Sequence, residues 1–203
     1  MDELKEIKIG HTKIIALKDG ELNLPKEVLV NLSDEIENNL DKNDLNLSNI
    51  NAFLIQKEGK NLLVDAGCRD IFGPTCGFIL DELDKANVKP KDITDIFFTH
   101  LHPDHVGGAV SKDGEPVFPN ASVKVLSKEI DFWRKDDFED IEVNGKNFAD
   151  LAKSVISAYG EKVSSIREVD EIINNVYPVS LPGHTPGRAG FRVDESNNTF
   201  MHL

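Results

Sequence analysis

The chain has 203 residues, of which 39% are hydrophobic and 29% are charged, and its formal net charge at pH 7 is −13. This length suits a single domain with a sizeable core. The negative charge argues against nucleic acid or an anionic membrane surface as a partner, because both attract basic surfaces. No run approaches the roughly 18 apolar residues of a membrane helix, and the N-terminus lacks a signal peptide's basic start and apolar run. We therefore expect a cytoplasmic protein.

The first third of the chain predicts two β-hairpins separated by a polar segment. Residues 5–20 contain two β-rich runs around a Gly-His turn. Residues 52–65 contain two apolar runs joined by a Glu-Gly-Lys turn. Between the hairpins, residues 25–50 are rich in Asn and Asp, and we interpret them as a loop with helical turns that forms a cap or lid.

The remaining two thirds alternate predicted helices and strands. Pro74 opens an amphipathic helix that runs to about Asn87. Residues 95–99, DIFFT, contain a continuous apolar run over 96–98, as expected of a strand buried on both faces. Further strands are predicted at 121–127, 163–167, 173–181, 188–193 and 199–203, and further helices from 127 and over 146–160. This alternation, combined with hairpins, predicts an α/β sandwich with mixed sheets.

Three histidines and an aspartate follow the apolar strand directly, in the sequence THLHPDHVGG. His100 and His102 are two residues apart, so an extended backbone points both side chains toward one metal. Pro103 then turns the chain and redirects Asp104 and His105 to a neighbouring position. Imidazole and carboxylate ligands suit zinc and, less selectively, manganese, iron, cobalt or nickel. The pattern therefore predicts a divalent metal site, and a cluster of exposed or capping histidines is the alternative.

Two further features support a metal site. Gly107 and Gly108 allow the backbone to pass close to the ligands, and we expect them to begin a helix. The segment LPGHTPGRAG, residues 181–190, holds His184 between two Pro-Gly turns after a predicted strand. A histidine on such a rigid turn is well placed to be a third ligand.

These motifs, THLHPDHVGG followed by PGHTPG, resemble those of the metallo-β-lactamase-fold hydrolases. The resemblance extends from about residue 50 to the end of the chain. Within that superfamily the sequence is most similar to methyl parathion hydrolase and related lactonases, through DIFGPTCG at 70–77, FPNA at 118–121 and EIDFW at 129–133. The resemblance implies an αββα sandwich formed by a single domain over residues 1–203, which lacks the final part of its C-terminal half.

The resemblance also implies two metals, most simply zinc. Five residues match family ligands: His100, His102 and His184 for the first metal, and Asp104 and His105 for the second. Asp65 matches an aspartate that supports the ligands in that fold. The family's bridging aspartate and last histidine would fall after Leu203, so we expect the first metal site to be favoured. His202 lies in the last predicted strand, and we interpret it as a packing or edge residue.

The implied reaction is hydrolysis of a small ester-like molecule: a lactone, an ester or a phosphotriester. Two metals would share a hydroxide as the nucleophile and stabilise the developing negative charge. Asp104 would bind a metal and orient the hydroxide or shuttle its proton. An aromatic wall of Phe72, Trp133 and Phe148 would contact the substrate, although core packing is the alternative for each.

Two other functions stay open at this point. A truncated, catalytically impaired domain would bind one metal or none, and its open sheet edge would favour a homodimer or other self-association. A glyoxalase II-like thioesterase is a weaker alternative, because that family usually carries a histidine where Leu101 stands here.

Overall fold

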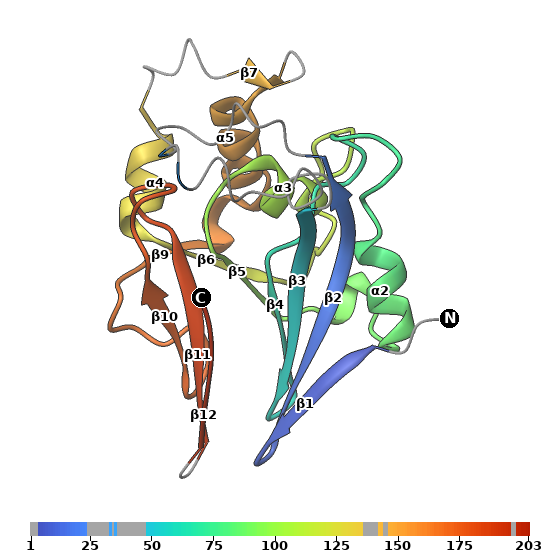
Figure 1. The fold of residues 1–203 in the computed structure, drawn as a ribbon, viewed down its shortest axis with the longest axis vertical. Coiled ribbons are helices and arrows are strands. Elements are labelled where there is room, and N and C mark those ends of the chain that lie inside the picture. The colour runs from blue at the N-terminus through green and yellow to red at the C-terminus, as the bar shows by residue number, and fades with distance from the viewer. Residues whose placement is uncertain are drawn as a thin grey trace.

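The computed structural model describes residues 4–23, 33, 35, 48–135, 142–143, 146–195 and 198–203. Seven strands form its largest sheet; in spatial order they are β1 (Lys5–Ile9), β2 (Thr12–Leu22), β3 (Ser48–Lys57), β4 (Lys60–Val64), β5 (Asp95–Phe98), β6 (Ser122–Leu126) and β9 (Val163–Ile166). Strands β1 to β4 pair in antiparallel fashion, whereas β4, β5, β6 and β9 run parallel. The mixed sheet confirms the predicted strand arrangement (Figure 1).

A second sheet and the helices complete the described fold. The second sheet is antiparallel and contains β10 (Val176–Ser180), β11 (Ala189–Glu195) and β12 (Asn198–His202), while β7 (Glu142–Val143) and β8 (Lys146–Asn147) form a separate ribbon. The α-helices are α2 (Ile79–Lys85), α3 (Pro103–Val106), α4 (Ser127–Trp133) and α5 (Phe148–Tyr159), and short 3₁₀ turns occur at Pro90–Asp92, Gly107–Ala109 and Gly160–Lys162. None of the described helices has the length and apolar character needed to cross a membrane.

The seven-stranded sheet lies between two apolar cores. In β5, Phe98 belongs to the core shared with helices α2 to α5, whereas Phe97 belongs to the core shared with the second sheet. Adjacent residues of a strand point to opposite faces, so the apolar run of β5 fills both cores. In β2, Ile15 belongs to the helix-side core and Ile14 belongs to the core shared with the second sheet. The described residues thus form three of the four predicted layers: helices, a large mixed sheet and a small sheet.

The helix predicted from Pro74 begins only at Ile79. Gly77 has a φ of +97°, which lies outside the helical region and favours glycine. The buried carboxylate of Asp19 accepts hydrogen bonds from the backbone N–H groups of Gly77 and Ile79, at 3.2 and 2.9 Å. The helix prediction failed over its first residues because a partner distant in the sequence holds this backbone in another conformation.

The predicted cap or lid at residues 25–50 lies mostly outside the described residues. Its last three residues, 48–50, belong to β3, so the prediction is wrong for them. They pair with the end of β2, where Ser48 lies opposite Leu22 and Asn49 lies opposite Glu21. The length of β2 explains the difference, because its backbone offers hydrogen-bond partners beyond the predicted hairpin.

Candidate metal centre

The segment that carries the first histidines begins where β5 ends. Thr99 is fixed there by Asp65, whose carboxylate accepts hydrogen bonds from the Thr99 N–H at 2.9 Å and from the Thr99 hydroxyl at 2.8 Å. Because that hydroxyl has given its only proton to Asp65, it can only accept from the neighbouring His100 Nδ1, 3.1 Å away. This chain of bonds places the proton of His100 on Nδ1 and leaves a lone pair on Nε2.

The turn after His102 differs in one respect from the prediction. Helix α3 begins at Pro103, whose fixed φ suits the first position of a helix, whereas only a short 3₁₀ turn begins at the glycines. Gly107 and Gly108 pass close to the backbone after β4. A Cβ on Gly108 would lie 2.0 Å from the Ala66 carbonyl oxygen, so the close approach that glycine permits here is to this backbone.

His100, His102 and His184 lie together at one end of the sheets, and we call them the histidine cluster. One ring nitrogen of each lies within 4.8 Å of the others, and His102 Nδ1 is 2.9 Å from His184 Nε2. His100 is 2% exposed, and its Nε2 is buried without a hydrogen-bond partner among the described residues. Buried polar atoms are rarely left unsatisfied. An unprotonated, unpartnered nitrogen that faces two other imidazoles fits a divalent cation.

All three histidines are held in the neutral form. Burial, reinforced by the neighbouring imidazoles, lowers the pKa of His100 far below its ordinary value. Burial and the proximity of His184 lower the pKa of His102 to about 4, against the opposing pull of Asp104. The pKa of His184 is lowered by burial and by the positive charge of Arg188. Only neutral imidazole binds a metal, so at neutral pH these ligands need lose no proton.

Asp65, Asp104 and His105 form a second group, which we call the carboxylate–histidine cluster. His105 Nδ1 lies 2.7 Å from Asp65 Oδ2, and His105 Nε2 lies 3.2 Å from Asp104 Oδ2. Burial opposes the charge on His105, but the two carboxylates outweigh it and raise its pKa to about 10. Burial would raise the pKa of Asp104, but His105 and His102 hold it at about 2. A cation bound by Asp104 and His105 must therefore displace a proton from His105.

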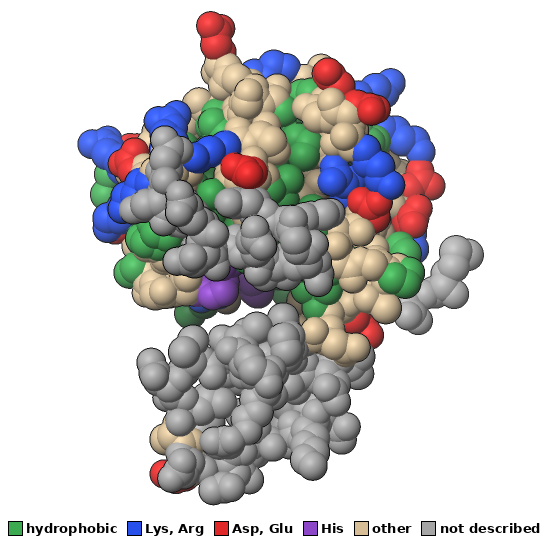
Figure 2. Space-filling view, turned by 90° about the horizontal axis from the view of Figure 1, so that it is seen from above, with side chains coloured by type: hydrophobic (Ala, Val, Ile, Leu, Met, Phe, Trp, Pro, Cys, Tyr) green, Lys and Arg blue, Asp and Glu red, His purple; other side chains and the backbone are tan. Residues whose placement is uncertain are grey.

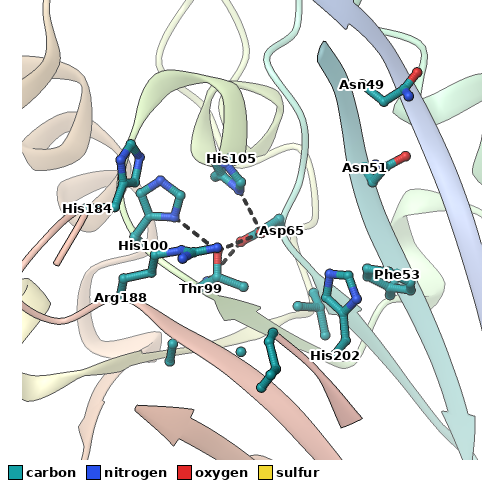
Figure 3. A pocket seen from close by; sticks show the side chains of 14 residues that line it. Asn49, Asn51, Phe53, Asp65, Thr99, His100, His105, His184, Arg188 and His202 are labelled. Carbon is teal, nitrogen blue, oxygen red and sulfur yellow. Dashed lines mark hydrogen bonds and ion pairs between the residues drawn. The ribbon is translucent and has the colours of Figure 1, made fainter. Parts of the chain in front are cut away.

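Residues of both clusters line one pocket of about 390 Å³: His100 and His184 of the first, and Asp65 and His105 of the second (Figure 3). The view from above shows histidine side chains reaching the surface at this end of the molecule (Figure 2). His202 lies across the pocket from the ligands and packs on Phe53, with 4.4 Å between the ring centroids. It belongs to β12, which pairs only with β11 among the described strands, as expected of a packing or edge residue.

Thr99 and Arg188 are among the residues of this pocket that sequence reasoning missed. Thr99 immediately precedes His100 at the end of β5, so its place in the ligand motif was the available signal. Arg188 lies in the same Pro-Gly segment as His184, and its side chain points toward Thr99 and Asp65 (Figure 3). The positive charge of Arg188 lowers the pKa of His184 and contributes to the lowered pKa of His100. Arg188 therefore offers a positive charge to a ligand of the pocket.

The three residues of the predicted aromatic wall lie in different surroundings. The rings of Trp133 and Phe148 lie 5.5 and 5.4 Å from that of His102. Trp133 is 1% exposed, so it has almost no surface for a substrate, whereas Phe148 is partly exposed. Phe72 packs on a separate apolar cluster, and none of the three residues lines the pocket. Of the three, Phe148 both contacts the histidine cluster and exposes part of its side chain. Its contact with substrate stays a prediction.

This site and fold define the class of protein. A family model of the metallo-beta-lactamase superfamily matches residues 45–200, and the chain belongs to this superfamily. It is 31% identical over 105 residues to a probable metallo-hydrolase of Methanocaldococcus jannaschii, a match that covers 52% of this chain and 44% of that protein. The chain therefore matches less than half the length of this curated relative.

Two solved structures are similar over almost the whole chain. One is AidC, a dizinc quorum-quenching lactonase in complex with the product N-hexanoyl-L-homoserine, with a TM-score of 0.85 and 29% identity. The other is the hydrolase AbOPH of the β-lactamase superfamily, with a TM-score of 0.83 and 26% identity. Each match covers 98% of this chain and 72% of the other. The predicted superfamily is confirmed, whereas the likeness to methyl parathion hydrolase stays a prediction.

Proposed function

We propose that this chain provides the metal-binding part of a hydrolase that acts on lactones or on related esters and phosphotriesters. The observation that carries the proposal is the histidine cluster: three neutral imidazoles converge, and the Nε2 of His100 is buried without a partner. Similarity to a dizinc lactonase and to a hydrolase of the same superfamily supports it.

The donor set indicates the metal and the roles of the residues around it. Three imidazole nitrogens suit zinc, and the histidine cluster would hold it. A bound divalent cation would supply a Lewis acid for the substrate's carbonyl or phosphoryl oxygen and would acidify a water molecule. With a pKa of about 2, Asp104 is ionised at neutral pH, so its carboxylate can accept a hydrogen bond from the attacking water and orient it. Arg188 would pair with the negative charge that ester hydrolysis creates on the acid product.

One observation bears on the choice between this activity and a glyoxalase II-like thioesterase. Leu101 occupies the position where those thioesterases usually carry another histidine, and here its side chain is 0% exposed within the helix-side core. A buried aliphatic residue cannot take part in metal binding. The lactonase and esterase classes are therefore the better match to this site.

The test is metal-dependent hydrolysis of three probes: N-hexanoyl homoserine lactone, 4-nitrophenyl acetate and paraoxon. We expect turnover of at least one probe with Zn²⁺, and a loss of more than about 100-fold in His102→Ala, because one of three ligands is removed. His11→Ala is the matched control, since His11 is exposed in the turn between β1 and β2. A chain that binds Zn²⁺ and hydrolyses none of the probes would instead be an impaired metal-binding domain.

A further inference from the structure

Glu129 is a fully buried carboxylate on α4, with 0% of its surface exposed. Burying a carboxylate is costly unless its oxygens receive hydrogen bonds, so its partners show what the residue does. Glu129 belongs to neither of the two segments that carry the histidine cluster. It nevertheless bonds to both of them.

The first oxygen of Glu129 binds the segment that carries His100 and His102. Oε1 accepts a hydrogen bond at 3.0 Å from the N–H of Leu101, the residue between these two histidines. The same oxygen accepts the indole N–H of Trp133 at 2.6 Å. The backbone between the two ligands is thereby fixed to α4.

The second oxygen binds the segment that carries His184. Oε2 accepts the hydroxyl of Thr185 at 2.7 Å and the N–H of Gly187 at 3.1 Å. A Cβ on Gly187 would lie 2.2 Å from the backbone nitrogen of Glu129, so this segment passes directly over α4 at a place that only glycine permits. A backbone bond from Ala189 to Thr99 also joins the two segments, but it lies beyond the ligands.

We propose that Glu129 is a positioning residue that sets the separation of His102 and His184 for metal binding. One carboxylate joins the two ligand segments, with one oxygen for each, so His102 Nδ1 and His184 Nε2 are held 2.9 Å apart before a cation arrives. Such preorganisation strengthens binding because less freedom is lost when the ligands close on the cation. The inference rests on the proposed metal site, although its readouts do not require catalysis.

Two substitutions separate this role from general stabilisation of the core. Glu129→Gln keeps the shape but replaces one accepting oxygen with a donating NH₂ group, which then faces donors of one ligand segment. Thr185→Val removes a single bond to Oε2 with little change in shape, and Thr185→Ser keeps that bond. Asp95→Asn is the matched control, since Asp95 is a buried carboxylate at the other end of β5, where it pairs with Lys60 and Lys124.

The experiment measures Zn²⁺ affinity by competition with a chromophoric chelator, and amide hydrogen exchange at Leu101 and Gly187 in the metal-free protein. We expect Glu129→Gln to weaken Zn²⁺ binding roughly 10- to 100-fold and Thr185→Val about fivefold. Thr185→Ser and Asp95→Asn should stay within about twofold of the unmodified chain. Exchange at Leu101 and Gly187 should accelerate in Glu129→Gln more than exchange elsewhere in the protein.

Three results would overturn the proposal: unchanged Zn²⁺ affinity in Thr185→Val, equal weakening in Glu129→Gln and Asp95→Asn, or unchanged exchange at the two amides. If Glu129→Gln does not fold, the pair Thr185→Val and Thr185→Ser decides on affinity alone. Strong Zn²⁺ binding without hydrolysis of any ester would refute the proposed function and leave the role of Glu129 intact. Exchange at Leu101 and Gly187 tests the joining of the segments even if no cation binds.

Discussion

The histidine cluster and the carboxylate–histidine cluster both contribute residues to one pocket but are prepared for a cation in opposite ways. The first is neutral and leaves His100 Nε2 without a partner. The second is charged, and its members already satisfy one another, since His105 bonds to Asp65 through one nitrogen and to Asp104 through the other. Adjacent ligands of one short motif therefore need not have equal affinity for a cation. A cation that binds the first cluster displaces no proton from the protein. A cation that binds the second cluster must displace the proton of His105.

The largest expected effect comes from removing the histidine with the unpartnered nitrogen. His100→Ala should weaken the first Zn²⁺ equivalent by more than about 100-fold, whereas His105→Ala should affect mainly a second equivalent. Isothermal titration at pH 7 measures both. His202→Ala is the matched control, because His202 lines the same pocket but packs on Phe53. A loss in His202→Ala as large as in His100→Ala would make His202 a ligand.

A smaller effect concerns the charged cluster in the metal-free protein. The pKa of His105 is raised from 6.5 to about 10, so its ion pairs stabilise the fold fully below about pH 6.5 and are lost as the pH rises through about 10. We expect the free energy of unfolding to fall by a few kcal/mol across this range, with an upper bound of roughly 5 kcal/mol for a shift of this size, as measured by urea denaturation.

Asp65→Asn tests whether this pH dependence arises from the cluster. Asparagine tolerates the positive φ of +60° at this position, so the substitution removes the charge without adding strain. The variant should lose about 2 kcal/mol of stability at pH 6 and should show a much flatter decline at higher pH. An unchanged slope would mean that other groups cause the decline.

The smallest expected effect concerns the substrate. Phe148 is partly exposed beside His102, so Phe148→Leu should raise KM about two- to fivefold for a lactone substrate and leave kcat nearly unchanged. Phe72→Leu is the control, because Phe72 packs on a separate apolar cluster. A larger KM effect for Phe72 than for Phe148 would contradict this placement of the substrate.

The sequence predicted the parts of the site that depend on local pattern. A buried strand followed by His100 and His102 indicated a metal site, and the Pro-Gly turns around His184 indicated a third ligand; the structure brings all three together. Glu129 left no such signal, since its partners in the two ligand segments lie 28 to 58 residues away in the chain. The late start of α2 has a similar origin, because Asp19 lies 58 and 60 residues from the amides that it binds.

The position of the first bound cation shows most directly whether the neutral histidine cluster is the preferred metal site. Crystals grown with one equivalent of Zn²⁺ per chain can be measured by anomalous diffraction at the zinc edge. We predict one strong peak, bounded by ring nitrogens of His100, His102 and His184. A strongest peak between Asp104 and His105, or no peak in the pocket, would contradict the claim that the neutral histidine cluster is the preferred metal site.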